Sequence, residues 1–203
     1  MKTQKKIFAL ILLICFPVSI HAQVEGHEDL IRLRAAEKVG QMNDYIKNMA
    51  DKSQTMNYRN RRKTKALNLY VGKGYEYVED GVRKEGVQMQ VTSKNKAKIG
   101  QPLIRRYFDN LVGQKLDRIY TNVKIEATEV ADIKVSSLRK VDDNLWECTC
   151  VYDQAFEGWR DGRPIYRDIT TKRIKCYVIA EQTEDDGWEF IILLGDVYAI
   201  KTK

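Results

Sequence analysis

The stretch that decides the fold is "LWECTCVYDQAFEGWRDGRPIYRDITTKRIKCYVIA", residues 145–180. Residues 145–156 and 165–180 both alternate between apolar and polar side chains, which is typical of half-buried β-strands. Between them lies "RDGR", residues 160–163, and an Asp-Gly pair flanked by alternating segments is a strong hairpin signal. The stretch therefore predicts a long antiparallel β-hairpin.

The apolar faces of these two strands set the expected register. A three-residue loop, Asp161 to Arg163, puts Cys148 opposite Cys176, with Cys150 one diagonal step away. A two-residue turn at Asp161-Gly162 would place the apolar faces on opposite sides of the hairpin. We therefore predict the three-residue loop.

Three further segments extend the hairpin into a sheet. "WEFIILLGDVYAI", residues 188–200, follows the turn signal "EDDG", residues 184–187. On the other side, "YTNVKIEATEV" (residues 120–130) and "DIKVSSLRKV" (residues 132–141) also alternate. Long strands joined by Asp/Gly turns predict an antiparallel meander.

Helical patterns come before the strands. Residues 28–52 place one apolar stripe at helical spacing, and Ser53 can cap a second helix over about residues 54–70. The stripe consists of Leu30, Ile31, Ala35, Val39, Met42, Ile46 and Met49. "PLIRRYFDNLV", residues 102–112, predicts a third helix, with Pro102 in its first turn and Gly113 at its end. A turn at Asp80-Gly81 and a strand "VQMQVTS", residues 87–93, are expected in between.

Helices first and strands after them predict an α+β fold. This order of elements, with "PLIRRYFDNLV" as third helix and "WEFIILLGDVYAI" as closing strand, resembles the nuclear transport factor 2-like (cystatin-like) superfamily over residues 28–201. The resemblance implies a cone-shaped fold with N-terminal helices packed on a curved antiparallel β-meander. Families with this fold include isomerases, dehydratases, ligand carriers and secretion-system parts, so the fold does not select a function.

The N-terminus predicts export. Lys2, Lys5 and Lys6 precede an apolar run over residues 7–16, and cleavage after Ala22 fits a signal peptidase. We expect a signal peptide over residues 1–22 and a single α+β domain over residues 23–203, periplasmic or secreted and without a transmembrane segment. Loss of three lysines lowers the formal charge from +7 to +4. "HAQ" at the cleavage point resembles exported bacterial proteins of the Bacteroides type.

Three cysteines remain in this domain, which leaves two structural readings open. Cys148 and Cys176 are candidates for a disulfide in an oxidising compartment, or all three can pack as buried free thiols. Three thiols and one histidine, His27, are too few for a tetrahedral metal site, so we expect none. The one-residue spacing of Cys148 and Cys150 also differs from the redox motif with two intervening residues.

Candidate chemistry is left to carboxylates and tyrosines, because His27 alone cannot complete a histidine-based catalytic set. The resemblance implies a pocket between the helices and the open end of the sheet, with Tyr107, Tyr152, Asp168 and Tyr198 as residues that could line it. A buried carboxylate beside a tyrosine is adequate for proton transfer, so Asp168 and Tyr152 are the catalytic candidates. The alternative is an Asp168 that is solvated, or paired with Arg167 or Lys172.

Two charged segments are candidate binding surfaces. "YRNRRKTK", residues 58–65, is basic, but it lacks interleaved aromatic residues, so a solvated helix face is the simpler reading and no nucleic-acid partner is expected. The hairpin loop contains Trp159, Arg160 and Tyr166, which are residue types enriched at binding hot spots. Trp159 either forms an exposed interaction edge there or folds back over the sheet.

These features favour a non-enzymatic, exported binding or assembly module of the bacterial envelope, without a cofactor. An unidentified envelope protein or small ligand is the expected partner, and the sheet is the expected surface for a homodimer. Two alternatives remain: a small pocket enzyme of isomerase or dehydratase type, or a ligand carrier, with the same fold; and a conjugation or secretion-system component. An open pocket with a buried carboxylate would favour the enzyme or carrier, and a filled interior the module.

Overall fold

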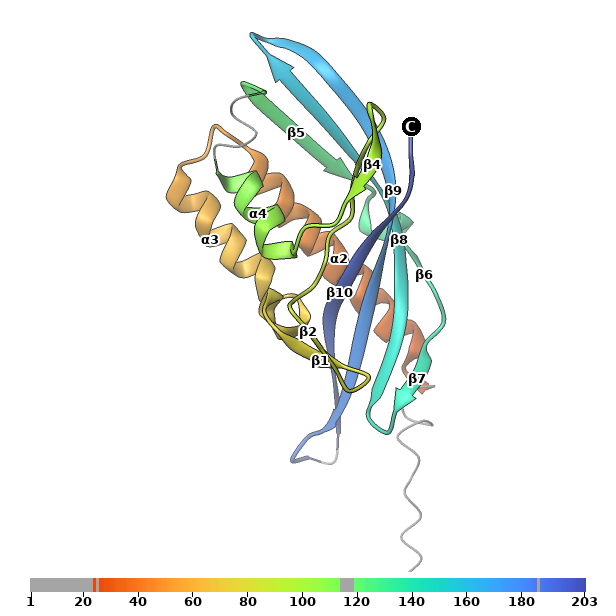
Figure 1. The fold of residues 1–203 in the computed structure, drawn as a ribbon. Helices are drawn as coiled ribbons and strands as arrows, with labels where there is room; N and C mark the ends of the chain where they lie inside the picture. Colours follow the sequence, from red (N-terminus) through yellow and green to blue (C-terminus); the bar gives the residue numbers. More distant parts are fainter. Residues whose placement is uncertain (1–23, 25, 114–118, 186) are drawn as a thin grey trace, which may run out of the picture.

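In the part of the chain that the structure describes, three helices lie on one side of a curved antiparallel sheet, as Figure 1 shows. The computed structural model describes residues 24, 26–113, 119–185 and 187–203, and the predicted signal peptide lies outside them. The helices are α2 (Glu28–Ala50), α3 (Met56–Leu67) and α4 (Ile104–Val112), with short 3-10 turns η1 (Val71–Gly74) and η2 (Val130–Asp132). The predicted α+β architecture is confirmed. No helix within these ranges is long and apolar enough to cross a membrane.

The sheet is built on two very long strands. Its order is β10 (Trp188–Thr202), β9 (Arg163–Gln182), β8 (Leu145–Arg160) and β5 (Asn122–Ala127), all antiparallel. The predicted strand over residues 132–141 is broken into β6 (Lys134–Val135) and β7 (Arg139–Asp142), which both pair with β8. The helix α2 packs against β5, β6, β8 and β10, so the buried faces of the meander lie under this helix.

In the β8–β9 hairpin the strands pair as predicted, but the loop has two residues in place of the predicted three. Cys148 is opposite Cys176, and the same register runs to Gly158 and Tyr166. A bulge between Gly158 and Trp159 then shifts the register, so that Arg160 pairs with Arg163 across a two-residue turn. Asp161 and Gly162 both have positive φ, 49° and 75°, as a type I′ turn requires. The extra residue lies in the strand and not in the loop.

Two small hairpins lie between the η1 turn and α4 along the chain. The strands β1 (Tyr77–Glu79) and β2 (Val82–Lys84) flank the predicted turn at Asp80-Gly81. The predicted strand over residues 87–93 is shorter than expected: only β3 (Val91–Ser93) pairs, with β4 (Lys96–Gly100). Gln88 and Met89 form isolated bridges, the latter to Val197 of β10. The alternation there reflects a segment that runs along the edge of β10.

Helix boundaries differ from the prediction where local hydrogen bonds decide them. Thr55 caps α3 in place of Ser53, because the Thr55 side chain accepts the hydrogen bond from the Tyr58 backbone N–H. This helix ends at Leu67, and Tyr70 lies beyond it in the core. The predicted stripe of α2 is fully buried except for Leu30, which is 41% exposed.

Arg59 corrects the reading of the basic segment as a solvated face. Its side chain is buried, and its guanidinium donates hydrogen bonds to the carbonyl oxygens of Met49 and Leu111, both at 2.8 Å. These two carbonyls lie in the last turns of α2 and α4, where backbone oxygens have no partner within the helix and the helix dipole is negative. Arg59 therefore joins the C-terminal ends of two helices from a third.

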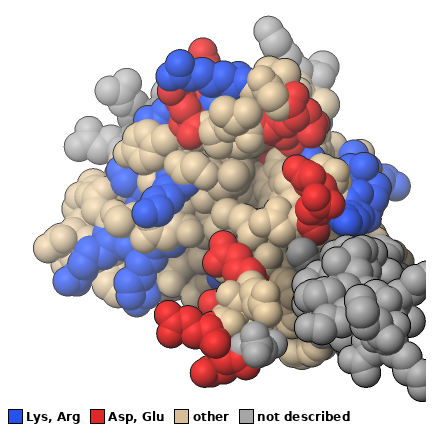
Figure 2. All heavy atoms as spheres, turned by 90° about the horizontal axis from the view of Figure 1, so that it is seen from below, with Lys and Arg blue, Asp and Glu red and all other residues tan. Residues whose placement is uncertain are grey.

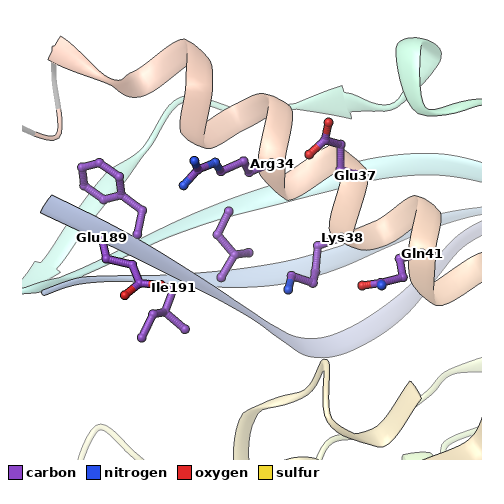
Figure 3. Close-up of a pocket in the computed structure, with 8 residues that line it drawn as sticks. Arg34, Glu37, Lys38, Gln41, Glu189 and Ile191 are labelled. Carbon is purple, nitrogen blue, oxygen red and sulfur yellow. The ribbon is translucent and has the colours of Figure 1, made fainter. Parts of the chain in front are cut away.

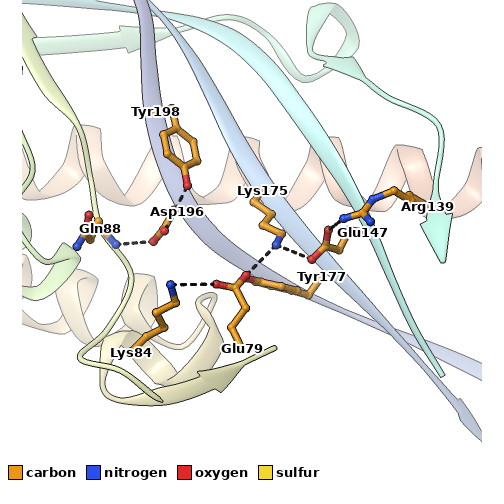
Figure 4. A network of polar contacts seen from close by, with 9 residues as sticks. All are labelled: Glu79, Lys84, Gln88, Arg139, Glu147, Lys175, Tyr177, Asp196 and Tyr198. Carbon is orange, nitrogen blue, oxygen red and sulfur yellow. Dashed lines mark hydrogen bonds and ion pairs between the residues drawn. The ribbon is translucent and has the colours of Figure 1, made fainter. Parts of the chain in front are cut away.

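The other face of the sheet carries an ionic network that holds the β1–β2 hairpin (Figure 4). Lys175 Nζ lies 2.7 Å from Glu79 Oε1 and 2.5 Å from Glu147 Oε1, and Tyr177 donates a hydrogen bond to Glu79. Arg139 completes the network with Glu147. The end of the molecule drawn in Figure 2 likewise shows basic and acidic side chains near one another, rather than a field of one sign.

Candidate functional site

One strand changes from an apolar to a polar inner face along its length. In β9, Ile174, Cys176 and Val178 are core residues, and side chains two apart share a face. Toward the hairpin tip the same face continues with Lys172, Thr170 and Asp168, which are only 5–6% exposed. A buried charged residue is rare unless it is paired or functional. The half of β9 near the hairpin tip is therefore the candidate for a functional site.

These polar residues line an open cavity of about 370 Å³ beside α4, which we call the cone pocket. The β3 segment, α4, β8 and β9 all contribute to its wall. Its lining combines apolar and aromatic side chains with a few polar groups, the usual composition of small-molecule sites. The lining residues used below are Ser93, Tyr107, Tyr120, Phe156, Tyr166, Asp168 and Lys172.

Asp168 accepts a hydrogen bond from Tyr166, whose own hydroxyl is fixed by two further hydrogen bonds. Tyr166 donates its O–H to Asp168 Oδ2, and the Tyr166 oxygen lies 2.7 Å from Ser93 Oγ and accepts from the Lys94 backbone N–H at 3.2 Å. Burial, followed by the hydrogen bond to Asp168, raises the pKa of Tyr166. The phenol thus stays protonated at neutral pH and fixes the orientation of the carboxylate.

Lys172 lies deeper in the same wall with little to neutralise it. Its Nζ is 3.6 Å from Met89 Sδ and 5.8 Å from the centre of the Tyr107 ring, both weak partners for an ammonium group. Burial lowers the pKa of Lys172 to about 8, and the negative field of Asp168 opposes this only in part. A lysine with a pKa near neutrality can both donate and accept a proton.

The structure brings together some of the predicted site residues and separates others. Tyr107, Tyr166 and Asp168 line the cone pocket. Tyr152 is buried opposite Lys172, but it is not among the lining residues, and its hydroxyl has no hydrogen-bond partner among the described residues. Tyr198 lies on the opposite face of the sheet, where its hydroxyl is 3.4 Å from Asp196 Oδ2 (Figure 4). It therefore cannot act together with Asp168.

Trp159 and Arg160, the other two predicted binding residues of the hairpin, do not line the cone pocket. Trp159 is half-buried after the bulge, and it lines a groove together with Lys47, Asn48 and Asp51 of the α2 end. Arg160 is exposed and donates to the Ile119 carbonyl at 3.1 Å and 2.5 Å. The hairpin tip thus does not present an isolated exposed tryptophan.

The cysteines belong to the core. All three are buried free thiols, and the sulfur atoms of Cys150 and Cys176 lie 3.7 Å apart. No group of histidine, cysteine or acidic side chains within the described ranges is arranged to hold a metal ion. The trio packs as small apolar residues beneath the polar part of β9.

A second, larger depression of about 520 Å³ lies between α2 and the edge of β10 (Figure 3). Its labelled charged residues Arg34, Glu37 and Glu189 are exposed, and Lys38 is half-buried. It offers no buried carboxylate or amine, so the groups there keep their solvation. The cone pocket is therefore the stronger candidate.

The pocket wall depends on a glycine in β8. A Cβ atom at Gly158 would lie 2.2 Å from Cε1 of Tyr120, whose ring packs against Phe156 with centroids 5.6 Å apart. Gly158→Ala is expected to displace the Tyr120 ring and to cost about 1–3 kcal/mol of stability, as overpacking usually does. Urea unfolding checks this value. In a Tyr120→Ala background most of the cost should disappear, and an unchanged cost would show that the clash does not involve Tyr120.

Sequence reasoning missed Lys172, Thr170 and the aromatic wall residue Tyr120 as parts of the site. A signal was present for the first two: Asp168, Thr170 and Lys172 recur with period two in phase with Ile174 and Cys176. Polar residues in phase with a core face indicate either a satisfied buried network or a cavity. Nothing comparable marks Tyr120, because its position follows from the chain path before β5.

No protein-family model matches this sequence, and no curated protein matches it. Several solved structures are similar over most of its length. A candidate scytalone dehydratase from Novosphingobium aromaticivorans DSM 12444 shares 13% identity, with 88% of this chain and 90% of that chain covered and a TM-score of 0.39. A hexachlorocyclohexane dehydrochlorinase of type 2 shares 11% identity, with 86% and 91% covered and a TM-score of 0.36. A candidate dehydratase of the NTF2-like family from Streptomyces avermitilis shares 13% identity, with 82% of this chain and 97% of that chain covered and a TM-score of 0.33. Similarity at this level carries no information about chemistry, which is argued below from the site alone.

Proposed function

We propose that this protein binds a small amphipathic organic molecule in the cone pocket and transfers a proton to or from one of its carbon atoms, as lyases and isomerases do. The observation that carries the proposal is the pairing of a buried carboxylate, Asp168, with a buried and poorly partnered amine, Lys172, in the wall of one open cavity. Two titratable groups of opposite type in one pocket are a common arrangement for acid–base catalysis.

The two groups have different roles in this proposal. Asp168 is the base, because the Tyr166 O–H holds one of its oxygens and leaves the carboxylate fixed in direction. Lys172 is the acid or the electrostatic stabiliser of the negative charge that develops on the ligand. A ligand that fills the pocket displaces water from the apolar and aromatic lining, which strengthens both effects.

A non-enzymatic envelope module was the reading that the sequence favoured, and it predicts a filled interior with an exposed aromatic patch. The cone pocket is open, and Trp159 is half-buried. These two features favour the enzyme or carrier reading instead. Export, an envelope partner, dimerisation through the sheet and a secretion-system role stay predictions from the sequence.

Carbon-acid exchange tests the proposal without knowledge of the natural substrate. The protein is incubated in D₂O with a panel of small ketones, aldehydes, esters and nitro compounds, and loss of the activated C–H signal is followed by ¹H NMR. Turnover of at least one compound is expected, and Asp168→Asn should slow it by about 100-fold or more, the usual contribution of a positioned base. Asp109→Asn, on the exposed side of α4, is the matched control and should exchange at the wild-type rate. Binding without exchange would identify a carrier. The absence of both binding and exchange would contradict the proposal.

A further inference from the structure

The two lysines of β9 differ in their surroundings in a way that bears on the chemistry of the cone pocket. Lys175 faces the outer side and is held by two carboxylates, Glu79 and Glu147, at 2.7 Å and 2.5 Å. Lys172 faces the pocket, and among the described residues its one hydrogen-bond acceptor is the thioether of Met89. No described carboxylate is close enough to hold a proton on Lys172. The surroundings of Lys172 thus favour the neutral amine more than those of Lys175 do.

This difference changes how often the amine is available as a nucleophile. With the pKa of Lys172 lowered by burial to about 8, about one molecule in ten carries the neutral amine at pH 7. For an ordinary lysine the fraction is below about one in a thousand. Desolvation in an apolar pocket is a known way to activate a lysine toward carbonyl carbons.

We propose that Lys172 is a covalent catalytic residue whose amine condenses with the carbonyl carbon of an aldehyde or ketone held in the cone pocket. The nitrogen lone pair forms a C–N bond as the carbonyl π bond opens, and the resulting carbinolamine loses its oxygen as water to give an imine. Both hydrogens of that water come from the neutral amine. The inference rests on the proposed function, since it takes the same pocket and specifies the class of substrate.

The neighbouring groups suit this step. Phe156 and Tyr107 supply apolar surface for the carbon skeleton of the ligand. Asp168 lies on the same strand face as Lys172, with Thr170 between them, and both residues line the cone pocket. Once protonated, the imine draws electrons from the adjacent carbon. Removal of a proton there by Asp168 leaves an enamine, which gives the exchange reaction proposed above its electron sink.

Reductive trapping tests the inference on the wild-type protein. The full chain is incubated with benzaldehyde and cyanoborohydride, which reduces an imine to a stable secondary amine, and the modified lysines are identified by peptide mass spectrometry. Lys172 is expected to react at least about tenfold faster than Lys175 or the exposed Lys201 at pH 7. Its rate should level off above pH 8, whereas the rates of ordinary lysines continue to rise. Lys172→Met must lose the adduct at this site, and Lys175→Met must keep it.

The outcomes separate this inference from the proposed function. Benzyl alcohol, which has the same ring but no carbonyl, is added in parallel and its binding is followed by chemical-shift changes of pocket residues. Labelling concentrated at Lys172 supports the inference. Labelling spread evenly over the surface lysines, while benzyl alcohol still perturbs the pocket, overturns the covalent role and leaves the proton-transfer site standing. Even labelling with no perturbation of the pocket overturns both.

Discussion

Lys172→Met is expected to stabilise the protein by about 2–3 kcal/mol at pH 7, although most substitutions of a buried residue destabilise. The reason is that the native state buries this ammonium with only weak partners, whereas the unfolded chain leaves it in water. The pKa of Lys172 falls from 10.5 to about 8, and each pKa unit corresponds to about 1.4 kcal/mol. Loss of the favourable interaction with Asp168 offsets part of the gain. Methionine keeps an unbranched, flexible side chain at this position without the charge.

The pH dependence of this effect has a definite sign. Below pH 8 both states of the wild-type protein are protonated at Lys172, so the native state carries the whole penalty. Between pH 8 and pH 10.5 the unfolded state binds more protons than the native state, and the wild type gains stability as the pH rises. The advantage of Lys172→Met should therefore be largest at pH 7 and shrink toward pH 10. Urea unfolding of both proteins at pH 7 and pH 9.5 measures the change.

Lys175→Met is the matched control from the same strand. Burial alone would lower the pKa of Lys175, but the hydrogen bonds to Glu147 and Glu79 outweigh it and raise this pKa. The charge of Lys175 therefore stabilises the native state at pH 7, and the substitution should destabilise the protein. This contribution is present below the unfolded pKa of 10.5 and is lost as the pH rises beyond it. A Lys172→Met variant that is less stable than the wild type at pH 7 would show that the ammonium is well solvated or paired.

Arg59→Ala is expected to destabilise the protein by about 3–4 kcal/mol. The substitution removes two charge-assisted hydrogen bonds, each worth roughly 1.5–3 kcal/mol, and leaves the buried carbonyls of Met49 and Leu111 without their partner. Some relaxation and water entry should reduce the sum. Because these bonds join the last turns of α2 and α4 to α3, the loss should appear as earlier unfolding of the helical layer, measured by circular dichroism at 222 nm during urea unfolding.

Arg61→Ala, two residues along the same helix, provides the comparison. Arg61 is exposed, so its removal should change the stability by no more than about 0.5 kcal/mol. Both variants remove one positive charge from α3, and the difference between them therefore isolates the buried hydrogen bonds. Equal effects of the two substitutions would contradict the role given to Arg59.

The sheet could be predicted from the sequence because its signal is local and repeated. The alternation in residues 145–180 and an Asp-Gly pair are sufficient to predict the hairpin. The position of Cys148 opposite Cys176 follows from matching the apolar faces of the two strands. The close packing at Gly158 could not be predicted, because the Tyr120 ring that occupies the space above the glycine comes from a separate segment before β5. The role of Arg59 was hidden for a similar reason: its acceptors are 10 and 52 residues away in the sequence.

The site was predictable only in part. Asp168 and Tyr107 were selected by residue type and by the expected cone, and both line the cavity. Tyr198 lies on the other face of the sheet, because the register shift between Leu194 and Val197 in β10 decides which face it takes. The state of Lys172 depends on what surrounds its amine, and the relevant neighbours, Met89 and Tyr107, come from two other segments. A single strand pattern cannot supply that information.

The most direct test of the central claim is an NMR titration of Lys172 itself. The lysine side chains are labelled with ¹³C at the ε carbon, the Lys172 signal is assigned by its absence from Lys172→Met, and its shift is followed from pH 6 to pH 11. A midpoint near pH 8 is the predicted result, and it would establish a buried amine in the cone pocket that changes protonation near neutral pH. A midpoint close to 10.5, together with those of the surface lysines, would contradict both the acid–base role and the covalent role of this residue.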